Sequence, residues 1–167
     1  MKETFTIRRY EVGDWPSIAS MLHHAFSAGD SYAYGPDTTE TEAHKVWIES
    51  AKATYVACGS DGSILGTYIL KPNQPGLGSH VCNCGYVVAS AARGKGIGAA
   101  MCDHSQGEAR RFGFSSMQFN FVVSTNTAAV HIWQKLGFVI VGTLPCAFRH
   151  KVHGKVDVYV MFKHLDR

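Results

Sequence analysis

The sequence predicts a single mixed α/β domain over residues 1–167, with a mostly antiparallel sheet flanked by helices. A chain of 167 residues has room for one full hydrophobic core and too little for two. Strand-like segments follow one another in the first half of the chain, and strands alternate with helices in the second half. Neither an internal repeat nor a linker divides the chain, so all segments are assigned to one domain.

The first half of the chain predicts strands around two helices. Ile18, Leu22 and Phe26 recur at helical spacing. They follow Asp14, a residue type that caps helix starts. An Asp-Gly pair at 61–62 is typical of a β-hairpin turn. In chain order we expect a strand at 5–10, a helix from residue 15, a loop at 28–39, a helix at 40–52, strands at 54–58 and 63–70, a loop at 72–79 and a strand at 81–89.

The second half alternates more regularly. Ile132, Trp133 and Leu136 share one face of a predicted helix. Gly137 is the type of residue that ends such a helix. In chain order we expect a helix at 97–112, a strand at 117–123, the helix that ends at Gly137, and strands at 139–142 and 156–163 joined by a basic loop.

The composition excludes several classes of protein. Sixteen Lys and Arg against thirteen Asp and Glu leave a formal net charge of +3, too weak for the dense basic surface of a nucleic-acid binder. The five Cys are an odd set without the spacing of a zinc or redox site, and the first residues lack the apolar segment of a signal peptide. No run approaches the roughly 18 apolar residues of a membrane span. We therefore expect a cytoplasmic protein without a metal, a nucleic-acid partner or a membrane partner.

A glycine-rich turn between the strand at 81–89 and the helix at 97–112 carries the strongest chemical signal. Residues 93–98 read Arg-Gly-Lys-Gly-Ile-Gly. Glycines at alternate positions remove the Cβ atoms that would keep a ligand away from the backbone. The first amides of a helix favour an anion, and Arg93 and Lys95 add positive charge beside them. The turn is therefore suited to a diphosphate held by main-chain donors.

The spacing of this turn excludes two common phosphate-binding loops. A Walker loop needs Gly-x4-Gly-Lys followed by Ser or Thr, which the turn lacks. A dinucleotide fingerprint needs Gly-x-Gly-x-x-Gly, whereas Gly98 comes only two residues after Gly96. The pattern that remains is Arg-x-x-Gly-x-Gly.

This pattern resembles the acetyl-CoA pyrophosphate loop of the GNAT N-acetyltransferases. A second motif of that family, Asn-x-x-Ala before a helix that ends in Gly-Phe, is matched at 126–129 and 137–138. The resemblance implies a GNAT fold, acetyl-CoA as co-substrate, a strand pairing between Val88 and the pantetheine, and a bond from Asn126 to the cofactor arm. Asn126 also suits a helix N-cap, and the two roles can coexist. The cofactor-binding residues that the resemblance implies are Val88, Arg93, Gly94, Lys95, Gly96, Ile97, Gly98 and Asn126.

The sequence departs from the family pattern at the general acid. Many GNAT enzymes carry a Tyr seven residues after the motif Asn, where it protonates the departing CoA thiolate. Here that position is Trp133, whose indole N–H is no acid near neutral pH. Tyr159 on the last strand is the remaining candidate acid, and a core tyrosine is its alternative role. A thiolate whose conjugate acid has a pKa of about 8.5 can also leave without a dedicated acid.

Two amides stand where a general base would be expected. The strand at 81–89 holds Asn83 and no carboxylate, and the next strand holds Asn120. A buried Asn costs free energy unless both ends of its amide are bonded. Each amide therefore either bonds within the sheet or positions the substrate or a relay water. We take both as candidate catalytic and substrate-binding residues, with Tyr32 and Tyr34 as further candidates to line the substrate cleft.

A narrower resemblance bears on the acceptor. Residues 72–76, His80, Asn83 and 119–120 are similar to the fungal azetidine-2-carboxylate acetyltransferases, which act on proline analogues. The function implied is direct acetyl transfer from acetyl-CoA to a small amine, such as an amino or imino acid. A protein or peptide N-terminal acetyltransferase and a non-catalytic acyl-CoA-binding module are the alternatives. The resemblance also implies a homodimer, because members of the GNAT family often form dimers.

Overall fold

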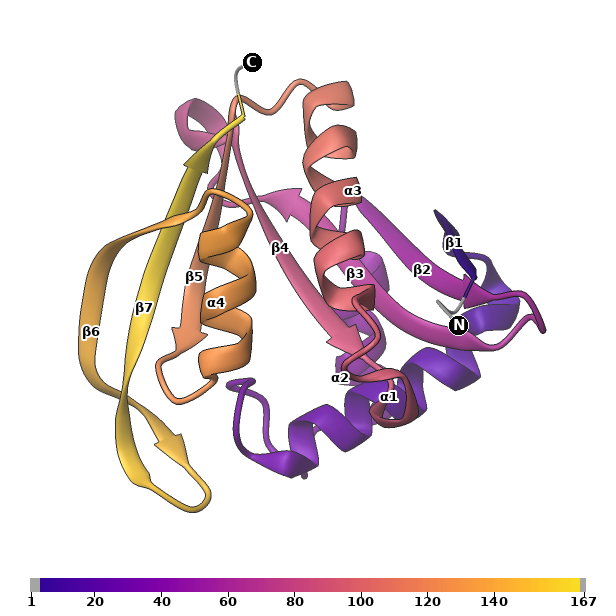
Figure 1. Ribbon diagram of the computed structural model, residues 1–167, viewed down its shortest axis with the longest axis horizontal. Coiled ribbons are helices and arrows are strands. Elements are labelled where there is room, and N and C mark those ends of the chain that lie inside the picture. Colours follow the sequence, from indigo (N-terminus) through magenta and orange to yellow (C-terminus); the bar gives the residue numbers. More distant parts are fainter. Residues whose placement is uncertain (1–3, 166–167) are drawn as a thin grey trace.

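The computed structural model describes residues 4–165 (Figure 1). Its strands and helices are β1 (Phe5–Arg9), α1 (Trp15–Ala28), α2 (Glu40–His44), a π-helical turn (Lys45–Glu49), β2 (Ala53–Gly59), β3 (Ile64–Pro72), β4 (Val81–Val88), α3 (Ile97–Arg111), β5 (Ser116–Val123), α4 (Thr127–Lys135), β6 (Val139–His150) and β7 (Gly154–His164). Short 3-10 turns lie at Val12–Asp14, Gly76–Gly78 and Ser90–Ala92.

The seven strands formed by the described residues belong to one mixed sheet. Its strand order is β1-β2-β3-β4-β5-β7-β6. The pairing of β4 with β5 is parallel and every other pairing is antiparallel. The predicted fold class, a mixed and mostly antiparallel sheet flanked by helices, is therefore confirmed.

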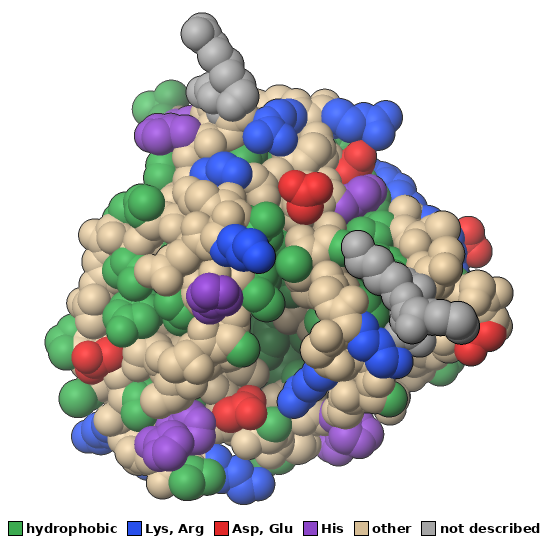
Figure 2. Space-filling view, viewed as in Figure 1, with side chains coloured by type: hydrophobic (Ala, Val, Ile, Leu, Met, Phe, Trp, Pro, Cys, Tyr) green, Lys and Arg blue, Asp and Glu red, His purple; other side chains and the backbone are tan. Residues whose placement is uncertain are grey.

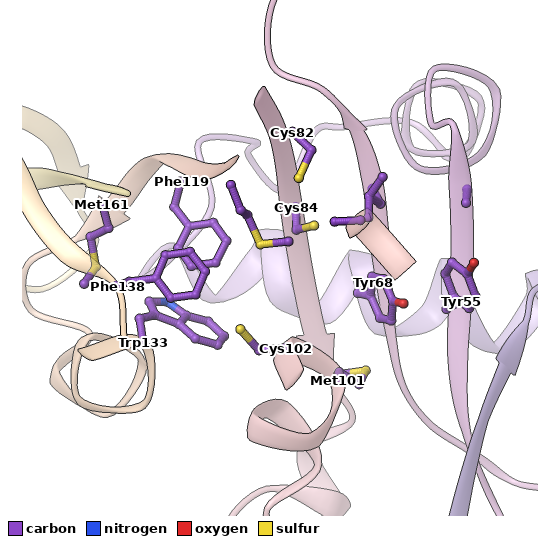
Figure 3. Close-up of a cluster of buried hydrophobic side chains, with 14 of the residues drawn as sticks. Tyr55, Tyr68, Cys82, Cys84, Met101, Cys102, Phe119, Trp133, Phe138 and Met161 are labelled. Carbon is purple, nitrogen blue, oxygen red and sulfur yellow. The ribbon is translucent and has the colours of Figure 1, made fainter. Parts of the chain in front are cut away.

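Helices cover both faces of the sheet (Figure 1). On one face α3 and α4 enclose the larger core, in which Phe119, Trp133 and Phe138 pack side by side (Figure 3). On the other face α1 packs around the buried Trp47 and Ile69. Alternate residues of a strand face opposite cores, so the register of each central strand decides which side chains reach which face.

The sheet opens between its two central strands. β4 and β5 pair only through Val81↔Ser116 and Cys82↔Met117 and then diverge (Figure 1). Further along, no strand of residues 4–165 pairs with the β5 side of β4, so its main-chain groups face a gap.

The prediction of a basic loop at 143–155 is wrong. β6 runs on to His150 and pairs with β7 as a long hairpin whose turn is at 151–153. Pro145 and Cys146 interrupt the ladder, where the register shifts between Leu144 and Phe148 and Cys146 has a φ of 54°. Among the described residues, no helix is long and apolar enough to cross a membrane.

Candidate functional site

A cleft of about 1000 Å³ runs through the gap between β4 and β5. The space-filling view is hollowed at this place, between α3 and α4, with hydrophobic side chains in its depth (Figure 2). Its lining includes the start of α3, which follows β4 in the chain, and residues from the segment after α1, β3, β4, β5 and the β6–β7 hairpin. We call residues 93–98 the glycine end, and we call the polar lining residues Tyr32, Lys71, Asn83, Asn120 and His150 the acceptor end.

The glycine end has the backbone geometry that its sequence predicts. Gly94 and Gly96 adopt left-handed φ values of 75° and 80°, a conformation that disfavours residues with a Cβ. Gly96 is the N-cap residue of α3, and no side chain caps this helix start. The first amides of α3 are thus available to an anion, beside the exposed Arg93. Lys95 is exposed and lies outside the cleft lining.

Main-chain groups of β4 line the gap between the two ends. Bonds from Asn73 N to Val81 O and from Ala89 N to Leu65 O mark the two ends of the β3–β4 ladder. Bonded pairs alternate in an antiparallel ladder, so residues 82, 84, 86 and 88 point their N–H and C=O groups toward β5. Only Cys82 of these pairs with β5. The N–H groups of residues 86 and 88 therefore face the cleft, where the resemblance places the pantetheine beside Val88.

Trp133 packs into the wall of the cleft. The residue is 9% exposed, and its ring lies 5.0 Å from the ring of Tyr86 and 5.2 Å from that of Phe119, centroid to centroid. The Tyr86 hydroxyl bonds Ser105 Oγ at 2.7 Å, and burial holds its pKa well above the usual value. A phenol with a raised pKa stays protonated at neutral pH and is a weaker acid than a free tyrosine.

Two other predicted residues have simpler surroundings. Asn126 caps α4, its Oδ1 accepting from Ala129 N at 3.3 Å, while its side chain also lines the cleft. Tyr159 lies on β7, half-buried against the larger core and outside the cleft lining. The structure therefore does not place Tyr159 among the residues that line the cleft.

Asn83 and Asn120 lie on adjacent strands and both reach the cleft. Asn83 is half-buried, and its Nδ2 donates to Gln118 O at 2.9 Å. Asn120 is exposed, so the expectation that both amides are buried is wrong for this residue. Its Oδ1 accepts from Gln118 Nε2 at 2.8 Å, and its Nδ2 donates to Asn73 Oδ1 at 2.7 Å. Both amides thus have bonds with the sheet and its β3–β4 loop, and both also line the acceptor end.

Tyr32 and Tyr34 line the acceptor end from the segment after α1. The Tyr32 hydroxyl donates to Tyr86 O at 2.6 Å, which satisfies one of the carbonyls that face the gap. Burial raises the pKa of Tyr32, so it remains a neutral donor. Tyr34 is more exposed and packs against Phe26 at 5.0 Å between ring centroids.

Sequence reasoning missed Lys71 and His150, which also line the acceptor end. His150 Nδ1 accepts from the main-chain N–H groups of residues 152 and 153 at 3.0 and 3.2 Å, so the neutral ring carries its proton on Nε2. The hairpin turn is held to the segment after α1 by a bond from Lys151 N to Gly29 O at 2.9 Å. Lys71 could have been noticed in the sequence as a charged residue directly after the apolar residues of a predicted strand. His150 lay in the segment that was predicted to be a basic loop.

One cysteine, Cys84, lines the cleft without the properties of a nucleophile. All five Cys are free thiols, and Cys84, which lines the cleft, is 7% exposed. Burial raises the pKa of Cys84 well above its usual value, so its thiol stays neutral. Within residues 4–165, no group of three or more His, Cys, Asp or Glu side chains is placed to hold a metal ion.

This architecture is that of the GNAT acetyltransferases. The profile of the Acetyltransferase (GNAT) family matches residues 15–138, which is most of the chain. The chain therefore belongs to the GNAT family.

Individual relatives agree with this assignment. A GCN5-related N-acetyltransferase from Kribbella flavida has a TM-score of 0.92 and 43% sequence identity, over 96% of this chain and 97% of that one. The structure of yncA from Salmonella typhimurium with its cofactor acetyl-CoA has a TM-score of 0.86 at 23% identity, over 98% and 95% of the two chains, a likeness of fold.

A curated relative matches a smaller region. N-acetyltransferase aca1 of Schizosaccharomyces pombe is 41% identical over 103 residues, which cover 61% of this chain and 49% of aca1. The match thus spans about half the length of that relative. The cytoplasmic location and the homodimer stay predictions.

Proposed function

We propose that this protein is an acetyl-CoA-dependent N-acetyltransferase that acetylates the amine of a small molecule. The observation that carries the proposal is one continuous cleft with an anion-binding helix start at one end and polar side chains at the other. The family membership and the similarity to aca1, which is named an N-acetyltransferase, support the same activity.

In this proposal the glycine end and β4 hold the co-substrate. The amides that open α3 bind the pyrophosphate, with Arg93 adding charge beside them. The pantetheine lies along the unpaired side of β4 and bonds the N–H groups of residues 86 and 88. Such a main-chain donor beside the thioester also stabilises the negative charge that develops on the carbonyl oxygen.

The transfer itself joins the amine nitrogen to the acetyl carbon and breaks the carbon–sulfur bond. The attacking amine must be neutral, so its ammonium proton leaves before the attack, and a second proton leaves the nitrogen afterwards. No carboxylate of the described residues lies on β4 to accept the first proton, and the neutral amide of Asn83 cannot accept it. Water in the open cleft takes both protons, and the thiolate leaves without a protein acid because its conjugate acid has a pKa of about 8.5.

For the acceptor we favour amino or imino acids, including proline analogues. Asn83 and Asn120, two of the residues on which the narrower resemblance to the azetidine-2-carboxylate acetyltransferases rests, both line the cleft and both bond Gln118, which supports this choice. Their amides orient a polar small molecule without neutralising its charge.

The test is release of CoA from acetyl-CoA, followed with a thiol reagent, over a panel of amines. The panel contains proline and its analogues, other amino acids, simple amines and short peptides. We expect acetylation of free amino or imino acids, with a product 42 mass units heavier than the amine, a shift that follows from adding C2H2O. Activity on peptides alone would favour an N-terminal acetyltransferase. Tight acetyl-CoA binding without release for any amine would favour a binding module and overturn the proposal.

A further inference from the structure

A lysine lies beside the candidate amine-binding amide at the acceptor end. Lys71, in the last part of β3, is the direct cross-strand partner of Asn83. Both residues are half-buried and line the cleft. Directly paired residues of antiparallel strands project from the same face with Cβ atoms about 4.5–5.5 Å apart. A ligand that contacts Asn83 is therefore within reach of the Lys71 ammonium.

The amide of Asn83 has a defined orientation. A carbonyl oxygen only accepts, so the atom that contacts Gln118 O must be the donor Nδ2. Oδ1 then points elsewhere and has no hydrogen-bond partner among the described residues. It is an acceptor suited to the N–H of an amine.

Lys71 is likewise uncommitted. No hydrogen bond or ion pair within residues 4–165 engages its ammonium. The other charged or titratable side chains that line the cleft are Asp30, Tyr32, Tyr34, Cys84, Tyr86, Arg93 and His150. Of these, Arg93 belongs to the glycine end, and Asp30 lies in the segment after α1 beside Ser31. An uncommitted cation in a partly desolvated cleft favours an anionic ligand.

We propose that Lys71 binds the carboxylate of an α-amino or α-imino acid acceptor whose amine is held by Asn83 Oδ1. In such a molecule the nitrogen and the carboxylate are attached to one carbon, so both groups lie close together. Lys71 pairs directly with Asn83 and carries its ammonium on a flexible four-carbon chain, which allows the ammonium to reach a carboxylate beside an amine held at Asn83. The inference rests on the proposed function, because it assumes that the acceptor end takes an amine. It assigns Lys71 as a specificity-determining residue that touches the substrate but exchanges no proton with it.

The test compares amino acids with their carboxamides, which keep the amine and lose the negative charge. The protein is saturated with CoA and titrated calorimetrically with L-proline, L-prolinamide, L-leucine and L-leucinamide. We expect at least one acid to bind about 10- to 100-fold more tightly than its amide, the range expected for one charge-assisted hydrogen bond. Lys71→Gln should remove this preference by weakening binding of the acid alone, and Lys71→Arg should keep most of it.

Lys155→Gln is the matched control, because Lys155 is exposed and lies outside the cleft lining. It should leave the acid-to-amide ratio unchanged. Thermal unfolding of each variant shows that it is folded. An unchanged ratio in Lys71→Gln, or a wild-type protein without preference for the acid, overturns the assignment of Lys71.

The thiol-release assay with the same four compounds separates this proposal from the proposed function. Equal CoA release with acids and amides would support the transferase activity and reject Lys71 as the carboxylate site. Binding of acids that depends on Lys71, without any CoA release, would support the site and reject the transferase activity.

Discussion

The glycine end of the cleft is formed by six consecutive residues, whereas the acceptor end is assembled from the segment after α1, β3, β4, β5 and the β6–β7 hairpin. The first uses main-chain groups, whose positions depend on φ values that only glycine adopts easily. The second uses side chains whose neighbours are set by strand register. Cofactor recognition is therefore local in the sequence, and acceptor recognition depends on the assembled sheet. Variants at the two ends should accordingly fail in different ways.

The largest effect is expected for Gly96→Val. A β-branched residue cannot easily adopt the φ of 80° at this position, so the turn must change its path and withdraw its amides from the pyrophosphate. We expect the Kd for acetyl-CoA to rise about 100-fold or more, equivalent to losing one or two charge-assisted hydrogen bonds, with the fold retained. Calorimetric titration measures this loss.

Gly107→Ala is its control, because Gly107 lies within α3, has an ordinary helical φ and has open space around its Cβ position. It should bind acetyl-CoA normally and unfold at an equal or higher temperature. Normal cofactor affinity in Gly96→Val would remove the glycine end from the cofactor site.

Asn83→Ala should have the next largest effect, at the opposite end. It removes the Oδ1 acceptor and leaves Gln118 O without its donor. We expect kcat/KM for the acceptor to fall about 10- to 100-fold, corresponding to 1–3 kcal/mol, while the Kd for acetyl-CoA changes little. Gln74→Ala, in the exposed β3–β4 loop, should behave as wild type. A loss confined to acetyl-CoA affinity would place Asn83 in the cofactor site instead.

Trp133→Phe separates packing from acid chemistry. If the indole only packs against Tyr86 and Phe119, Phe should preserve kcat within about threefold and destabilise the fold by about 1–2 kcal/mol through lost contacts. Steady-state kinetics and thermal unfolding measure the two effects. A tenfold fall in kcat with unchanged acetyl-CoA affinity would instead show that the indole N–H acts in the reaction.

The smallest effect is expected for Tyr32→Phe. It removes the donor to Tyr86 O, and we expect a loss of about 1 kcal/mol in stability with a modest change in acceptor KM. Because folding raises the pKa of Tyr32, its stabilising contribution is complete below the unfolded value of about 10 and is lost as the pH rises above it. The difference in melting temperature between wild type and variant should thus be constant from pH 6 to about 9 and shrink above pH 10. A difference that varied between pH 6 and 9 would contradict this.

The sequence predicted more of the glycine end than of the acceptor end, for a physical reason. The positive φ values at Gly94 and Gly96 and the helix start that follows are local properties, readable from six residues. The order of strands and helices was also predicted, since each long segment has its own periodicity. At the acceptor end, Asn83 was found because it is polar within an apolar run.

Other features depend on contacts that no local pattern contains. Lys71 becomes a neighbour of Asn83 only through the register of β3 against β4. His150 was hidden because Pro145 and the basic residues after it are typical of a loop, whereas pairing with β7 keeps β6 extended to that residue. Tyr159 was chosen for its chemistry, and in β7 it packs half-buried against the larger core.

One cleft is proposed to bind acetyl-CoA at the glycine end and the amine at the acceptor end. We would measure this with two-substrate steady-state kinetics, varying both concentrations, on the wild type, Gly96→Val and Asn83→Ala. We expect the wild type to transfer the acetyl group, Gly96→Val to raise the KM for acetyl-CoA alone, and Asn83→Ala to change the acceptor parameters alone. Equal changes for both substrates in each variant, or a wild type that released no CoA with any amine, would show that the cleft is not divided in this way.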